Sequence, residues 1–253
     1  MNVLTSIGTV FNREVRGKLR TPWPYVESML DPLLLLALFG PLVAGLGGIP
    51  GVPTTSTAQW FVPGILVIMT FSTSAFIGAG LQEEMHAGSL ERMLVTPVSR
   101  LALLIGRVLR VVVIVMVQAV VVVAITVPFG LRVHLDGLVI AVLQLAVLAA
   151  VLGVVSLGAG LMLKNAYAFW GVVTIFYTPV IITSGALLPM DLAPDWLFAI
   201  SRINPLAHVV EAQRSLFVGD LADPTVLLGF GVALAFGALG ALMGMRAMNR
   251  IAE

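Results

Sequence analysis

The chain has 253 residues, of which 59% are hydrophobic and 11% charged, and its mean hydropathy is +1.05. Soluble domains carry about 25% charged residues, so this composition excludes an ordinary soluble protein and indicates one that lies largely in a membrane. A spanning helix needs about 20 apolar residues, which leaves room for roughly six or seven spans and for no large soluble domain. The absence of cysteine excludes disulfides, thiolate metal sites and a cysteine nucleophile.

An amphipathic helix is expected over residues 1–22. Leu4, Ile7, Phe11 and Val15 recur every three or four residues, and basic residues occupy the remaining surface. A helix with this pattern and too few apolar residues to cross a bilayer is expected to lie in the interface with anionic lipids. The alternative is a basic flank that only orients the first span.

Six apolar stretches are expected to span the membrane, and two of them carry charged residues near their inner ends. Glu27 and Asp31 lie one helical turn apart, so they either face the bundle interior and contact substrate or pair with the basic N-terminal helix. Arg107 and Arg110 are expected to extend to the lipid headgroups. The stretches are residues 26–46, 60–81, 101–127, 138–163, 166–188 and 225–245.

Residues 189–224 interleave prolines and charged residues with apolar ones, a pattern suited to short helices that enter the outer leaflet only part-way. Just before them, Pro179 is expected to bend the fifth span. Of the 14 basic residues, all but Arg132, Arg202 and Arg214 fall on the side that carries both termini. The side richer in Lys and Arg is cytoplasmic, so residues 1–253 are expected to form one transmembrane domain with both termini inside.

Residues 82–100 are the densest polar stretch between two apolar runs, and the expected orientation places them in the cytoplasm. Leu90, Met93 and Leu94 share one face of a predicted short helix that Pro97 ends. Such a surface is suited to contact with another protein, although an ordinary connecting loop with a surface helix would have a similar local pattern.

Two parts of the chain resemble ABC-2 type permeases, the membrane subunits of a large group of ABC exporters. The first is the motif Glu84-x-x-x-Gly88-Ser89-Leu90-Glu91-x-x-Leu94-x-Thr96-Pro97, which is similar to the coupling helix in the first cytoplasmic loop of that family. The second is the pair Leu188-Pro189 and Asn204-Pro205, which matches a Leu-Pro turn and an Asn-Pro pair between the fifth and sixth spans.

The resemblance implies an all-α membrane protein of six transmembrane helices, as in ABC-2 or type V exporters. It would have an N-terminal interfacial helix, a cytoplasmic coupling helix and outer half-inserted helices between spans five and six. Pro189, Asn204 and Pro205 would then form an outer gate. The residues that would contact a separate ATPase are Glu84, Gly88, Ser89, Leu90, Glu91, Leu94, Thr96 and Pro97.

The same resemblance implies the partners of the chain. Two permease copies, identical or paralogous, would dock on two ABC ATPase subunits that carry ATP and Mg, while the chain itself would hold no metal and no cofactor. The sequence has no Gly-x-x-x-x-Gly-Lys-Ser/Thr motif, which agrees with a nucleotide site on another subunit. It also has no acid or histidine at mid-span, which argues against a carrier driven by protons or sodium.

The function expected from this resemblance, to permeases of the daunorubicin-resistance type, is export of a hydrophobic or amphipathic drug, lipid or polyketide across a bacterial inner or plasma membrane. The chain would contact membrane lipids and no nucleic acid. One alternative is an ABC-2 exporter of a lipid-linked glycan. Others are a structural membrane protein and a membrane-embedded enzyme acting on lipid, whose candidate residues are Asp191, Asp195, His208 and Glu211.

Overall fold

The computed structural model describes residues 29–30, 33–38, 41, 57–86, 100–163 and 165–251. The expected interfacial helix at residues 1–22 and most of the first expected span lie outside this part of the chain. So do residues 87–99, which hold most of the expected coupling helix. Within the first span, residues 29–30, 33–38 and 41 are helical.

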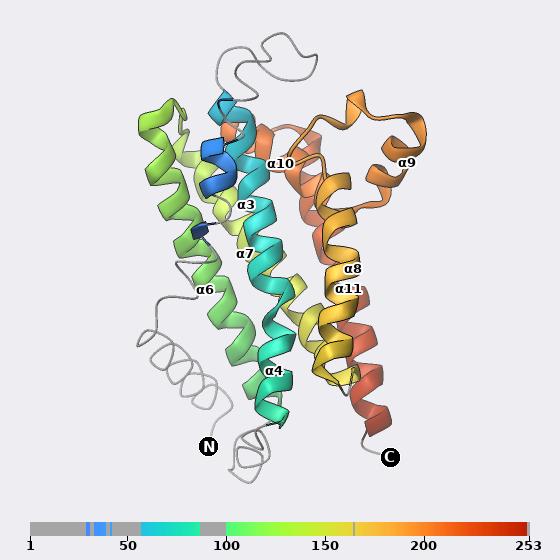
Figure 1. Ribbon diagram of the computed structural model, residues 1–253. Helices are drawn as coiled ribbons and strands as arrows, with labels where there is room; N and C mark the ends of the chain where they lie inside the picture. The colour runs from blue at the N-terminus through green and yellow to red at the C-terminus, as the bar shows by residue number, and fades with distance from the viewer. Residues whose placement is uncertain are drawn as a thin grey trace.

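Every element in the described ranges is a helix, which confirms the expected all-α class (Figure 1). Four stretches are long and apolar enough to cross a membrane: Ala58–Met85, Leu103–Phe129, Leu135–Met162 and Ala166–Thr183. A shorter apolar stretch covers Pro224–Gly240. The elements are α3 (Thr57–Ala75), α4 (Ile77–His86), α6 (Arg100–Thr126), η1 (Val127–Phe129), α7 (Leu135–Met162), α8 (Ala166–Thr183), η2 (Met190–Leu192), α9 (Asp195–Ile203), α10 (Pro205–Val218) and α11 (Pro224–Ile251).

The long helices run side by side, so the bundle has two ends (Figure 1). The lower end in that view holds the end of α4, the start of α6, the turn from α7 to α8 and the end of α11. The upper end holds η1, η2, α9, α10 and the start of α11. By their place in these elements, the described basic residues of the lower end are Arg100, Arg107, Arg110, Arg246 and Arg250, and those of the upper end are Arg132, Arg202 and Arg214.

Helix α7 is the centre of the bundle and packs against α3, α4, α6, α10 and α11. A helix that is apolar on all sides is stable only when it is surrounded, and α7 has this composition. Leu145, Leu148 and Ala149 are completely or almost completely buried in it. Close packing against α4 is possible because Gly160 of α7 lies directly against the backbone of Gly78.

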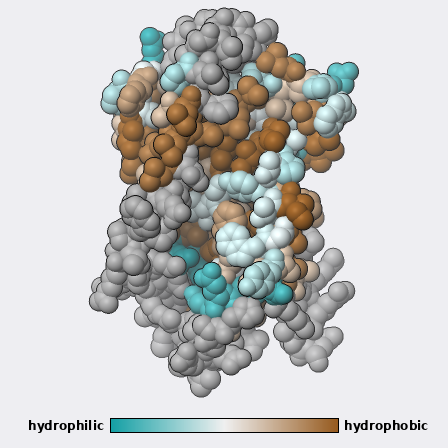
Figure 2. All heavy atoms as spheres, viewed as in Figure 1, coloured by the Kyte–Doolittle hydropathy of each residue, from teal (hydrophilic) through white to brown (hydrophobic). Residues whose placement is uncertain are grey.

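The outer surface of the bundle is apolar as well. Helix α6 turns Val111, Val115 and Val122 toward the core but leaves Val117 and Val120 more than half exposed. Figure 2 shows large brown, apolar areas on the visible face. Aliphatic residues on both the buried and the exposed side of a long helix indicate lipid as the surrounding solvent.

The helix formed by α3 and α4 is interrupted at Phe76, and Ser156 of α7 compensates for the interruption. Its hydroxyl donates to the carbonyl of Ala75 at 2.5 Å and accepts from the N–H of Gly78 at 3.0 Å. Unpaired backbone groups are expensive inside a membrane, so a neighbouring hydroxyl is what allows this break at mid-helix.

Helix α8 ends earlier than the expected fifth span and remains helical through Pro179. It stops at Thr183: the N–H of Ser184 bonds to the carbonyl of Ile181, three residues back and not four, and Gly185 adopts a left-handed conformation with φ of 71°. A positive φ is readily available to glycine and strained for other residues. The chain therefore leaves the helix before Leu188 and reaches η2 through a turn.

Candidate functional site

The lower end of the bundle carries the residues that flank the expected coupling helix. The carboxylate of Glu84, near the end of α4, forms an ion pair with the guanidinium of Arg107 on α6. Arg107 is only 3% exposed. The expectation that Arg107 extends to the headgroups is therefore wrong: a carboxylate from a neighbouring helix lies close enough to pair with it inside the bundle.

A second contact joins α4 to α7 at this end. The side-chain amide of Gln82, which is 1% exposed, donates to the carbonyls of Gly160 and Leu163. These carbonyls belong to the last turn of α7, where helical partners run out. Of the residues expected to contact an ATPase, Glu84 is described by the structure. The others lie outside the described residues: Gly88, Ser89, Leu90, Glu91, Leu94, Thr96 and Pro97.

At the upper end, Asn204 joins three elements. It ends α9, its side-chain oxygen accepts from the N–H of Leu206 as the N-cap of α10, and its amide donates to the carbonyl of Val180 and the hydroxyl of Thr183 on α8. Pro205 is the first residue of α10, a position where the missing N–H has no helical partner to lose. The Asn-Pro pair thus fixes the angle at which α9, α10 and the end of α8 meet.

Pro189, the third expected gate residue, lies in the connection between α8 and α9 and precedes η2. Asn204 and Pro205 lie at the other end of α9. The structure therefore places the three residues at the same end of the bundle, with Asn204 and Pro205 adjacent and Pro189 separated from them by α9.

Arg214 of α10, one of the three basic residues expected on the outer side, has specific partners in the structure. Its guanidinium carbon lies 3.8 Å from the centre of the Trp60 ring on α3, and its Nη2 donates to the carbonyl of Gly185 at 2.8 Å. A guanidinium can stack on a ring and donate hydrogen bonds in its plane at the same time. Arg214 therefore joins α10 to α3 and to the turn that follows α8. No spacing in the sequence indicates this contact.

Side chains of α3 and of Phe76, at the break after it, meet α8 along a strip of aromatic and hydroxyl groups. Tyr177 stacks on Phe71, and its hydroxyl lies 2.5 Å from that of Ser72. One to two turns further along, Phe76 stacks on Trp170. The rest of α8 is largely exposed, and the visible face has a pale zone of intermediate hydropathy where α4 and α8 lie (Figure 2).

The residues proposed for the enzyme alternative do not gather into a metal site. Within the part of the chain that the structure describes, no group of three or more His, Asp or Glu side chains could hold a metal ion. Glu211 instead pairs with Arg202 at 3.0 Å, and His208 bonds through Nε2 to the carbonyl of Arg202 at 3.0 Å. These contacts hold α9 against α10.

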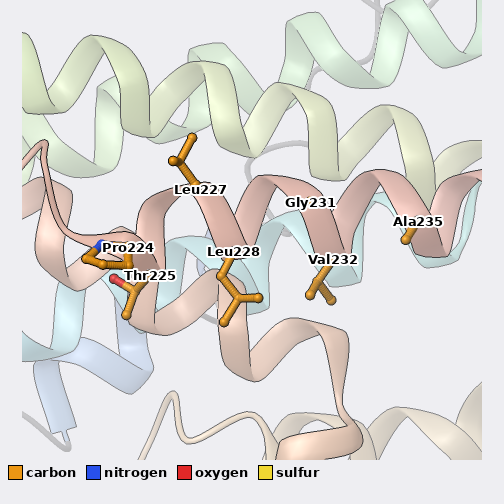
Figure 3. Close-up of a pocket in the computed structure, with 7 residues that line it drawn as sticks. All are labelled: Pro224, Thr225, Leu227, Leu228, Gly231, Val232 and Ala235. Atoms are coloured by element: carbon orange, nitrogen blue, oxygen red, sulfur yellow. The ribbon is translucent and has the colours of Figure 1, made fainter.

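A shallow groove runs along the exposed face of α11 (Figure 3). Apart from the hydroxyl of Thr225 its lining is apolar, and it is built from residues of one helix: Pro224, Thr225, Leu227, Leu228, Gly231, Val232 and Ala235. A groove without converging polar groups has no means of catalysis. It is suited to an acyl chain or to the side of another helix.

The fold and the two ends of the bundle define a class of helical membrane proteins, and comparison with known sequences identifies it. Residues 5–218 match the family described as ABC-2 type transporter, so the chain belongs to this family. Together with the apolar helices, this establishes a multi-pass membrane protein of the transporter class.

Several relatives are similar to the chain over most of its length. The transport permease ycf38 of Cyanophora paradoxa is 29% identical over 78% of this chain and 69% of its own length. The daunorubicin resistance ABC transporter permease protein DrrB1 of Streptomyces coeruleorubidus is 26% identical over 89% of this chain and 79% of its own length. The inner membrane transport permease YadH of Escherichia coli K12 is 25% identical over 91% of this chain and 90% of its own length. The relatives are named as transport permeases and not as enzymes.

Proposed function

We propose that the chain is the permease subunit of an ATP-driven exporter, in which a separate ABC ATPase supplies the energy. The observation that carries the proposal is the family match over residues 5–218, which spans the polar segment at residues 82–100. The chain has no P-loop motif, so an ATP-driven cycle requires a partner. Two permease copies, identical or paralogous, and two ATPase subunits form the working assembly.

The polar segment at residues 82–100 is the docking surface for that ATPase. A ligand biases a conformational equilibrium only through contacts that differ between the two states. Leu90, Met93 and Leu94 seat in a groove of the ATPase, and Glu91 meets a basic group there. The basic residues that gather at the lower end of the bundle support a cytoplasmic location for this end.

The exported compound is hydrophobic or amphipathic, such as a drug, a lipid or a polyketide. Support comes from the name of the relative DrrB1 and from the strip between α3 and α8. Phe71, Phe76, Trp170 and Tyr177 offer ring faces, and Ser72 offers a hydroxyl, which together suit a flat molecule with few polar groups. The alternative cargo is a lipid-linked glycan, for which the same helices would contact the lipid part.

The test is purification of the tagged chain with its ABC ATPase from native membranes, beside ATP-dependent uptake of daunorubicin into inverted vesicles. Loss of one buried charge contact costs about 2–5 kcal/mol at an interface, so Glu91→Lys is expected to weaken ATPase retention at least about tenfold and to abolish uptake. Arg100→Ala, at the start of α6, is the matched control and is expected to change both much less.

Full retention of the ATPase and normal uptake by a Glu91→Lys, Leu94→Asp double variant would remove the docking role from this segment. ATPase retention without daunorubicin uptake by the wild-type chain, together with accumulation of a lipid-linked glycan in cells that lack the chain, would replace the drug by the glycan as cargo.

A further inference from the structure

The two helices that flank the expected docking segment, α4 and α6, are joined by the ion pair of Glu84 and Arg107. The two residues are 23 positions apart in sequence, and residues 87–99 lie between them. Both helices pack against α7, but they make few contacts with one another. The ion pair is therefore a direct side-chain contact between α4 and α6, which are otherwise linked mainly because both pack against α7.

The two partners differ in their surroundings. Arg107 is 3% exposed, whereas the side chain of Glu84 is 36% exposed. A guanidinium does not lose its proton under ordinary conditions, so a buried one requires a nearby negative charge. Separating Glu84 from Arg107 would leave an uncompensated charge inside the bundle, and this resists any movement of α4 away from α6.

The end of α4, which carries Glu84, is also bonded to α7. Gln82, two residues earlier, donates to the carbonyls of Gly160 and Leu163 at the end of α7. The last turns of α4 are thus fixed to α7 by an amide and to α6 by a charge. A displacement of the last turn of α4 would therefore strain its contacts with both helices.

We propose that Glu84 and Arg107 are a positioning pair that transmits movement of the docking segment to α6, and that Glu84 acts within the chain and not by direct contact with the ATPase. The proposal rests on the proposed function, because the movement originates in an ATPase bound at residues 87–99, the part of the polar segment between α4 and α6. The carboxylate of Glu84 already accepts from the guanidinium of Arg107, so a basic group of the ATPase would have to share or displace this donor, and displacement would leave Arg107 buried without its partner.

The first experiment needs no ATPase. Because the chain has no cysteine, spin labels can be placed at Met85 and Leu109, which are 37% and 41% exposed on α4 and α6. The distance distribution between the labels is expected to broaden in Glu84→Gln and in Arg107→Gln, and to narrow again in the exchanged variant Glu84→Arg, Arg107→Glu. Glu83→Gln, which removes an adjacent exposed carboxylate, is the matched control and should leave the distribution unchanged.

The second experiment uses the permease with its co-purified ATPase. In Glu84→Gln, the ATPase is expected to remain bound while daunorubicin uptake per ATP hydrolysed falls about tenfold, with recovery in the exchanged variant. Unchanged label distances in both single variants would overturn the proposal. So would loss of ATPase binding in Glu84→Gln that the exchange does not restore, since this would indicate direct contact. If the wild-type chain binds no ATPase, the proposed function fails, and the label distances still decide whether the pair positions the helices.

Discussion

At the scale of single residues, two arginines of the described helices, Arg107 and Arg214, are each held by a specific partner from another element. Arg107 lies against the carboxylate of Glu84, and Arg214 lies between the ring of Trp60 and the carbonyl of Gly185. Burying a charge is unfavourable unless it is paired and hydrogen-bonded, so both residues depend on neighbours that are distant in sequence. Their substitution should affect the helices that they connect.

Arg214→Lys is expected to lower the free energy of unfolding by about 1–3 kcal/mol. A lysine keeps the charge but has no planar group that stacks on Trp60 while it donates to Gly185. The measurement is denaturant unfolding in mixed micelles, with Arg132→Lys, an exposed arginine at the same end, as control. A double-mutant cycle with Trp60→Leu should give a coupling of about 0.5–2 kcal/mol, and additive effects would contradict the contact.

Asp223 predicts a dependence of stability on pH. Its pKa is lowered from the ordinary 3.8 by the hydrogen bond from the N–H of Thr225 and then by the hydroxyls of Ser215 and Thr225. Because the pKa is lower in the folded state, the carboxylate stabilises the fold above pH 3.8, and this contribution disappears as the pH falls through the folded-state pKa. The residue precedes α11 and lies outside the apolar stretches.

The variant Asp223→Asn keeps a side-chain acceptor before α11 but cannot ionise. The melting temperature of the wild-type chain in detergent is expected to exceed that of the variant near neutral pH, and the difference should shrink below pH 3.8. Asp220→Asn, an exposed aspartate in the same turn, serves as control. A constant difference across the acidic range would show that the charge of Asp223 contributes nothing.

At the scale of helices, close approach at glycines determines where the elements cross. A Cβ atom added at Gly160 would lie 2.9 Å from the carbonyl oxygen and 3.1 Å from the Cα atom of Gly78. Backbone atoms cannot move aside as a flexible side chain can, so the whole helix would have to shift. Only glycine at position 160 is therefore compatible with the α4–α7 crossing. The hydrogen bonds of Ser156 and Gln82 join the same two helices.

Gly160→Ala is expected to destabilise the fold by about 1–3 kcal/mol through overpacking. Gly171→Ala is a matched control, because a Cβ at that position of α8 meets nothing within 4 Å and alanine is the better helix former by about 0.8–1.0 kcal/mol. Melting temperatures of the two variants in the same detergent should therefore move in opposite directions. A Gly160→Ala variant as stable as the wild type would show that the two helices are not in close contact.

At the scale of the whole molecule, the position of the helix ends predicts which residues face each side of the membrane. Asp136 lies in the first turn of α7 and Asp195 begins α9, so both lie at the upper end, whereas α4, which precedes Gly88 in the sequence, ends at the lower end. Basic residues favour the cytoplasmic side, and more of them belong to the lower end. The upper end is therefore expected to face outward.

Single cysteines at these three positions test the orientation, since the native chain has none. A membrane-impermeant maleimide added to intact cells is expected to label cysteine at positions 136 and 195. Cysteine at position 88 should react only after permeabilisation. Labelling of position 88 in intact cells, or protection of positions 136 and 195, would reverse the proposed orientation.

The sequence alone was sufficient for the class and family of this protein. Its composition and apolar runs predicted an all-α membrane protein, and the described helices confirm that class. The motif that begins at Glu84 indicated the ABC-2 family, and the match over residues 5–218 confirms it. These properties follow from local composition and spacing, which do not depend on how the helices pack.

The partners of individual polar residues were decided only by the tertiary structure. Arg107 was expected at the headgroups and is buried against Glu84, and the contact of Arg214 with Trp60 had no signal in the sequence. Periodicity shows which face of a helix is apolar, but a charge within an apolar helix has the same local pattern whether it faces lipid headgroups or a carboxylate. That choice depends on which helices lie side by side, and packing around α7 sets it.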